Sequence, residues 1–292
     1  MSDIQGMGWI RDYPDIRDYT PEHDNIKELF EEAKKKKVAA PKAGPVVDLR
    51  AFCTPIENQL NLGSCTANAG VGMYEYFENR SFMTFTNASR LFLYKVTRNL
   101  LGWNGDTGAF LRTTMGALVL FGTPPEKFCP YNVPDFDKEP TAFCYAYAQN
   151  FQALQYYRLD PPGTTPVAFL NTIKNYLNAG YVSIIGFTVY NSIAQASTTG
   201  KIPFPVPTDK VAGGHAIVLV GYDDGMKIKN TNPGGVDTTG ALIIRNSWGT
   251  GWGAAGYGYL PYDYILKGLA ADCWSMLKGE WVNSGQFGVP SP

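Results

Sequence analysis

The chain has 292 residues, of which 45% are hydrophobic, 17% charged and 14% aromatic, and its formal net charge is −1. This composition is that of an ordinary globular protein with one large domain or two, and no basic excess indicates nucleic-acid binding. No apolar run approaches the roughly 20 residues that a membrane-spanning helix needs. The first residues lack a cationic region followed by an apolar stretch, so we expect a cytoplasmic location unless export uses another route or a signal was removed.

Residues 1–44 differ from the rest of the chain in their pattern of residue types. Charged and aromatic residues alternate over residues 8–19 without the period of a strand or a helix. A short helix is predicted next, because Asn25 and Glu28 have the spacing of a capping box. A run of alanine, proline and glycine then indicates a linker that ends near Pro45.

The next part of the chain has mainly helical patterns. We expect helices over residues 64–80, 89–100 and 109–121, the third of them preceded by a glycine-rich turn and followed by Gly122 and Pro124. Small residues at the front of the first of these helices allow other elements to approach closely. This helix is therefore predicted to be central and buried.

From Gln152 onward the patterns are mainly those of strands. One helix intervenes, with Thr165 as its cap, Pro166 at its first position and Gly180 beyond its end. Runs rich in β-forming residues cover 181–190, 215–222, 241–246 and 256–260. Helices followed by strands predict an α+β fold of two packed halves, with a ligand-binding groove at their boundary.

A cysteine, Cys65, lies at the predicted start of the first helix, directly after a turn of small and polar residues. Free N–H groups and the positive end of the helix dipole favour a thiolate at such a position. The same N–H groups can bind the oxyanion that forms when a thiolate attacks a carbonyl, and Gln59 is an amide that could supply a second donor. The alternative is that Cys65 is a small buried hydrophobic residue.

The chain has two histidines, His23 and His215, and a nucleophilic cysteine needs a base. His215 follows a pair of glycines and opens an apolar run, which predicts a histidine at the mouth of a buried strand. Another predicted strand ends at Asn246 and is followed by two tryptophans among glycines. An asparagine there could hold the imidazole in one orientation, as in a Cys-His-Asn arrangement.

These three segments, in this order, resemble the Cys, His and Asn boxes of the papain-like cysteine peptidases. The most specific is Asn-Ser-Trp-Gly-Thr-Gly-Trp-Gly at residues 246–253. The sequences around Cys65 and His215 are similar to those of the short bacterial branch of the family. The resemblance spans about residues 45–275. It implies the papain-like fold, with a helical half and an antiparallel, β-barrel-like half on either side of the active-site cleft.

The resemblance implies a cysteine endopeptidase that works through a thioester acyl-enzyme. Cys65 would be the nucleophile, His215 the general base and acid, Asn246 the orienting residue and Gln59 the oxyanion donor. The implied substrate-binding residues are Gly63, Gly108, Ala109, Phe110, Gly214 and Trp248. Trp248 would also shield the His–Asn pair from water.

The implied S2 pocket, which takes the second residue before the cleaved bond, has its floor at about residues 271–274. Phe110 lies next to the position that walls this pocket, although it could equally be an ordinary core residue. No acidic residue is clearly placed to select arginine, so we expect hydrophobic side chains in S2. The substrate would be a peptide or protein, and we expect a monomer.

The chain departs from the papain signature at two positions. Leu62 replaces the cysteine upstream of the nucleophile, which removes a family disulfide but no catalytic group, and Thr66 replaces an aromatic residue. We therefore expect a reshaped site that still functions. The five cysteines contain no C-x-x-C pair and the chain has only two histidines, so no structural metal site is expected. The resemblance implies no cofactor either.

The predicted organisation is an N-terminal extension and linker (1–44) and a peptidase domain (45–292). Within the domain we expect a helical half at about 48–150, a β half at about 151–275 and a C-terminal tail. The extension is either a pro-like segment that lies across the cleft and restrains the enzyme, or a strap packed on the outside. Two other functions stay open, a Cys-His acyl transferase and a non-catalytic binding module on the same scaffold.

Overall fold

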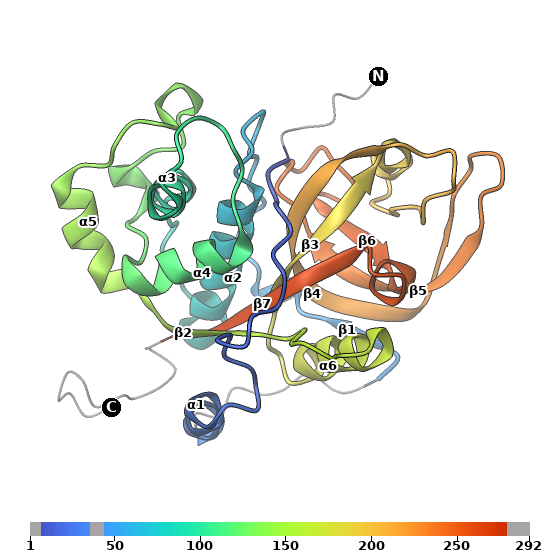
Figure 1. Cartoon of the computed structure of the whole chain (residues 1–292), viewed down its shortest axis with the longest axis horizontal. Helices are drawn as coiled ribbons and strands as arrows, with labels where there is room; N and C mark the ends of the chain where they lie inside the picture. The colour runs from blue at the N-terminus through green and yellow to red at the C-terminus, as the bar shows by residue number, and fades with distance from the viewer. Residues whose placement is uncertain (1–6, 36–43, 279–292) are drawn as a thin grey trace.

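The computed structural model describes residues 7–35 and 44–278. Figure 1 shows a helical half and a half dominated by strands, with the N-terminal segment running between them. The architecture is α+β, as predicted. Within these residues, no helix is both long enough and apolar enough to cross a membrane.

The helical half is built around α2 (Cys65–Phe82), which is buried at every position from its first residue to Glu78. The small residues of α2 allow this burial, because a Cβ at Gly70 would lie 3.1 Å from Thr114 and one at Gly72 would lie 3.1 Å from Arg245. The predicted central helix is therefore present. The helices α3 (Arg90–Leu101) and α4 (Leu111–Leu120) pack against it, and α5 (Ala142–Ala148) lies at the outer edge of this half (Figure 1).

The strands form one antiparallel sheet in the order β2-β7-β3-β4-β5-β6, with β1 paired to β4. This path has β2 and β6 at its ends, so in the described part of the chain the sheet is open and not a closed barrel. The strands are β1 (Val46–Asp48), β2 (Ala153–Arg158), β3 (Ser183–Tyr190), β4 (Val211–Lys229), β5 (Asp237–Arg245), β6 (Tyr257–Pro261) and β7 (Ala270–Lys278).

Three further helices complete the described structure. The predicted helix with Thr165 as its cap is α6 (Pro166–Asn178), which packs against β4 and against α7 (Tyr262–Leu266). The predicted N-terminal helix is α1 (Asp24–Lys35). Short 3-10 helices link these elements: η1 (Arg50–Phe52), η2 (Glu126–Phe128), η3 (Val133–Asp135), η4 (Gln149–Phe151) and η5 (Asn191–Ala196).

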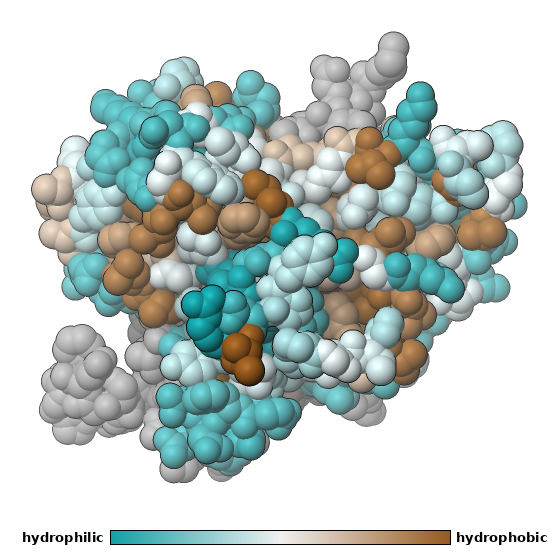
Figure 2. Space-filling view, viewed as in Figure 1, coloured by the Kyte–Doolittle hydropathy of each residue, from teal (hydrophilic) through white to brown (hydrophobic). Residues whose placement is uncertain are grey.

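The segment that precedes α1 contacts both halves. Trp9 forms a parallel bridge with Ala109, at the entrance to α4, and its N–H donates to the carbonyl of Gly214 in β4 at 3.1 Å. Figure 2 shows hydrophilic atoms running down the middle of this face of the molecule, between more hydrophobic patches on either side. The segment therefore lies between the halves and is not a strap on the outside.

Candidate active site

Cys65 is the first residue of α2 and is completely buried. The turn before it is held by α2 itself, because the Asn68 side chain donates to the carbonyl and to the hydroxyl of Ser64, each at 3.0 Å. The Ser64 hydroxyl also makes a hydrogen bond of 2.7 Å with that of Tyr131. The predicted placement of this cysteine at a helix N-terminus is thus observed.

His215 and Asn246 come from the strand half and meet in the interior. His215 lies on β4, Asn246 directly follows β5, and Nε2 of the histidine is 2.8 Å from Oδ1 of the asparagine. The indole of Trp248 stacks on the imidazole at 4.6 Å, and Phe187 of β3 meets it edge-on at 5.9 Å. Nδ1, on the other side of the ring, has no hydrogen-bond partner among the described residues.

The two halves bring Cys65 next to this histidine. The backbone N–H of Ala216, the residue after His215, lies close enough to the Cys65 thiol to act on it as a hydrogen-bond donor. This proximity follows from the packing of α2 against β4. A thiol from a helix and an imidazole from a strand therefore share one buried space.

Gln59 is tied to the residue that follows Asn246. Its backbone N–H donates to the carbonyl of Ser247 at 2.8 Å, and its side-chain oxygen accepts from the Ser247 hydroxyl at 2.6 Å. The amide nitrogen donates to the carbonyl of Leu62 at 2.8 Å, within the turn that leads to Cys65. The amide is therefore held on the same side of the site as the thiol.

Asp106 organises the cleft wall on the helical side, although the sequence predicts only a turn for its segment. Its carboxylate accepts from the N–H of Gly63 at 2.9 Å and from the hydroxyl of Tyr94 at 2.5 Å. The same hydroxyl accepts from the N–H of Gly108 at 3.1 Å. No local pattern connects residues so far apart in the chain, so the sequence held no signal for this role.

The predicted substrate-binding glycines lie along the N-terminal segment. A Cβ at Gly63 would come within 2.8 Å of the Met7 carbonyl, and one at Gly108 within 2.3 Å of the Gly8 carbonyl. Phe110 lies at the N-terminal end of α4, half-buried, with its ring 5.5 Å from that of Trp103. These contacts fit either of the two roles considered for it.

Burial controls the charge of the site. It raises the pKa of the Cys65 thiol to about 12, while the surrounding N–H groups act in the opposite direction; these belong to Ala216, Gly8, Thr66 and Trp9. Burial also lowers the pKa of His215 to about 4, against the effect of its bond to Asn246. With the segment in place, the thiol and the imidazole are therefore both neutral near pH 7.

Asp272 is an acidic residue that sequence reasoning does not place in the cleft. It lies within the stretch expected to form the floor of S2, is fully buried, and accepts a hydrogen bond of 2.9 Å from the Trp9 indole. Desolvation raises its pKa to about 6, although Arg158 and two indole N–H groups favour the ionised form. The stretch expected to bound S2 therefore contains a buried carboxylate, and the preference for hydrophobic side chains stays a prediction.

Comparisons with known proteins identify the family of the chain. A family profile described as papain family cysteine protease matches residues 43–272. An uncharacterized peptidase C1-like protein of Acanthamoeba polyphaga mimivirus is 30% identical over 92% of this chain and 86% of its own length. Peptidase 1 of Psoroptes ovis is 27% identical over 76% of this chain and 62% of its own.

Solved structures give the same result. The crystal structure of xylellain, a cysteine protease from Xylella fastidiosa, matches with a TM-score of 0.71 and 32% identity, over 94% of this chain and 96% of that one. The fold and these relatives define a cysteine peptidase, a hydrolase whose substrates are peptides or proteins. Within that class, the chain belongs to the papain family of cysteine proteases.

Proposed function

We propose that the chain hydrolyses peptide bonds with Cys65 as nucleophile, His215 as general base and acid, and Asn246 as the residue that orients the imidazole. The thiolate attacks the carbonyl carbon, and the oxyanion is held by the Cys65 N–H and the Gln59 amide. His215 gives its proton to the leaving amine, which leaves a thioester on Cys65. A water molecule, deprotonated by His215, then releases the acid and restores the thiol.

The observation that carries this proposal is the bond between His215 and Asn246 beneath Trp248. The bond at 2.8 Å uses Nε2, so Nδ1, which has no partner among the described residues, is the nitrogen available for proton transfer. Trp248 stacks on the ring and excludes water from the hydrogen bond. Such an arrangement fixes both the orientation and the tautomer of the imidazole, as a catalytic base requires.

We also infer that the N-terminal segment restrains this activity in the intact chain. Gly8 and Trp9 lie over the thiol, and their N–H groups also donate to the Gly214 carbonyl at 3.1 Å. A carbonyl carbon cannot reach Cys65 while these residues are there. Their N–H groups lower the pKa of the thiol, but burial of the site is the larger effect and favours the neutral thiol, which is a weak nucleophile.

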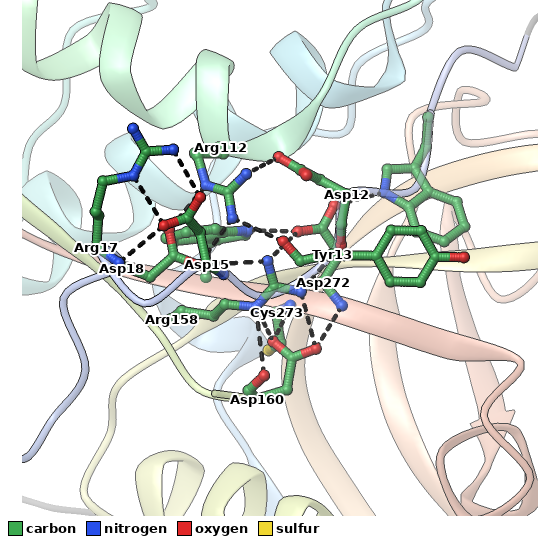
Figure 3. A network of polar contacts seen from close by, with 12 residues as sticks. Asp12, Tyr13, Asp15, Arg17, Asp18, Arg112, Arg158, Asp160, Asp272 and Cys273 are labelled. Atoms are coloured by element: carbon green, nitrogen blue, oxygen red, sulfur yellow. Dashed lines mark hydrogen bonds and ion pairs between the residues drawn. The ribbon is translucent and has the colours of Figure 1, made fainter. Parts of the chain in front are cut away.

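A polar cluster anchors the segment farther along. Arg112 of α4 pairs with the carboxylates of Asp12 and Asp18 and donates to the carbonyl of Tyr13 at 2.8 Å. Figure 3 shows these groups converging beside Arg158 of β2, whose guanidinium donates to the Asp12 carbonyl at 3.1 Å. The anchor is ionic, and the arginine is only partly exposed, so screening by salt should weaken it moderately.

The test is hydrolysis of fluorogenic dipeptide amides by the reduced full-length chain and by the same chain carrying Trp9→Ala. We expect low turnover from the first, higher turnover from the second, and none from either after Cys65→Ser. Gln59→Ala should lower kcat about 10²- to 10³-fold while leaving alkylation of the thiol unchanged. Turnover that survives Cys65→Ser would contradict the mechanism, and equal turnover with and without Trp9 would contradict the restraint.

A further inference from the structure

The side chain of Trp9 occupies a closely fitting space, which we call the Trp9 pocket; it is bounded by Gly186, Gly214 and Asp272. The residue is 8% exposed. A Cβ at Gly186 would lie 1.9 Å from the indole, and one at Gly214 would lie 2.9 Å from it. Only glycine at these two positions therefore leaves room for a ring of this size.

The backbone around Trp9 is held by both walls of the cleft. The N–H of Ala109 donates to the Gly8 carbonyl at 2.8 Å, and the Ala109 carbonyl accepts from the N–H of Ile10 at 3.1 Å. On the other side, Trp9 donates to Gly214. An extended peptide bonded to the same two walls presents one side chain to the Trp9 pocket. This step rests on the proposed function, because it takes substrates to follow this path.

Asp272 closes the end of the pocket with an acceptor whose two oxygens differ. Oδ1 accepts from the Trp274 indole at 2.7 Å and pairs with Arg158 at 3.3 Å, whereas Oδ2 accepts from Trp9 at 2.9 Å. The residue is fully buried and has a φ of +64°, so the backbone directs this carboxylate inward at some conformational cost. A buried oxygen of this kind needs a donor from whatever fills the pocket.

We propose that Asp272 is a specificity-determining residue: it selects substrates whose side chain in the Trp9 pocket is flat and carries an N–H donor, with tryptophan preferred. Tryptophan and arginine share this chemistry but differ in charge. Arg158 already pairs with Asp272 and Asp160, and Arg112 loses its carboxylate partners if the segment leaves (Figure 3). With these two guanidinium groups nearby, a neutral donor fits better than a further cation.

The test uses the full-length chain carrying Trp9→Ala, which vacates the pocket, and N-capped dipeptide coumarylamides that differ only in the first residue. Tryptophan is compared with 3-benzothienylalanine, which has the same shape but a sulfur atom in place of the N–H. We expect kcat/KM to be about 10- to 100-fold higher for tryptophan, since the lost bond is to a buried charged acceptor. Arginine should be a poorer substrate than tryptophan. The ratios of kcat/KM for tryptophan over benzothienylalanine and for tryptophan over arginine do not depend on the fraction of molecules that are open.

Asp272→Asn sharpens the test because its geometry is dictated by its neighbours. Trp274 and Arg158 both require an oxygen at the Oδ1 position, so the amide NH2 must face the pocket. A donor then meets the indole N–H, and the preference for tryptophan over benzothienylalanine should disappear. Glu75→Gln is the matched control. Glu75 lies on α2 and is also a buried carboxylate that accepts two hydrogen bonds, so this substitution should leave the ratio unchanged.

Binding gives a readout that does not depend on turnover. The corresponding N-acetyl dipeptide amides should protect Cys65 from iodoacetamide, tryptophan at about tenfold lower concentration than benzothienylalanine. Protection without hydrolysis would remove the proposed peptidase mechanism but support the pocket. Equal rates and equal protection for the two peptides, or a preference for arginine over tryptophan, would overturn the inference even where Asp272→Asn fails to fold.

Discussion

Trp9→Ala is the substitution that should open the cleft most. An aromatic side chain of this size buries about 150–250 Å², which corresponds to about 4–6 kcal/mol at ~25 cal/mol per Å². Alanine keeps its Cβ and water can refill the pocket, so the range of about 3–5 kcal/mol seen for buried aromatic truncations is the better figure. Because the ring packs between the segment and the domain, the change acts on the closing equilibrium. The open population should rise about 150- to 5,000-fold.

Alkylation of Cys65 by iodoacetamide measures this population, since the thiol is completely buried in the closed chain. The modified peptide is followed by mass spectrometry, because all five cysteines are free thiols and only this one should respond. Tyr13→Ala is the matched control from the same segment: its side chain is 72% exposed, so its loss should change the rate less than about twofold.

A Cys65 alkylation rate that is equal in the parent and the Trp9→Ala chain would refute the reasoning. It would mean that the segment does not close the route to the thiol, or that the indole contributes nothing to closure. An equal response to Tyr13→Ala would show that any change in the segment has the same effect. A melting temperature measured for each variant separates opening of the cleft from unfolding of the domain.

Gly186→Ala should also raise Cys65 alkylation, because its Cβ would collide with the indole, but it should add little in the Trp9→Ala chain. Arg112→Gln should raise the alkylation rate about 5- to 50-fold and reduce its dependence on salt, as one partly buried ionic anchor is lost. In a chain that carries Cys65→Ser and Asp272→Asn, neither a thiolate nor the buried Asp272 carboxyl titrates alongside His215, and acid should favour opening between pH 6.5 and about 4, up to about tenfold per pH unit. Burial lowers the pKa of His215 to about 4 in the closed chain, so the open form gains the proton first. Hydrogen exchange of peptides spanning residues 7–18, corrected for intrinsic rates, measures this; a flat profile would contradict it, and His215→Gln should flatten it.

Local pattern was sufficient to predict the elements that carry the site. The helix that begins at Cys65, the strand that contains His215 and the strand that ends before Asn246 are all observed, because each has a clear period and a clear boundary signal. Their ends differ from the predicted ones by a few residues, most of all for β4. Strand pairing extends β4 to Lys229, beyond its apolar run.

The features that could not be predicted depend on contacts between residues far apart in the sequence. Trp9 and Asp272 are 263 residues apart and meet only because the segment lies against β7, a strand that the sequence pattern does not predict. Asp272 has a positive φ, and the pairing of β3 with β7 shifts register between Ile184 and Gly186, so the stretch lacks a regular alternation. Asp106 likewise acts through Gly63, which is 43 residues away.

The pocket and the restraint use the same groups, so their strengths are linked. Asp272 binds the Trp9 indole in the closed chain and, in our proposal, a substrate donor in the open one. A change that improves the pocket for such a substrate therefore also tightens closure, and the net effect on the intact chain is small. Asp12 and Asp18 pair with Arg112 from the part of the segment that lies beyond the pocket. These two carboxylates leave with the segment, so changes at them should alter closure alone, and they are where regulation can vary without loss of specificity.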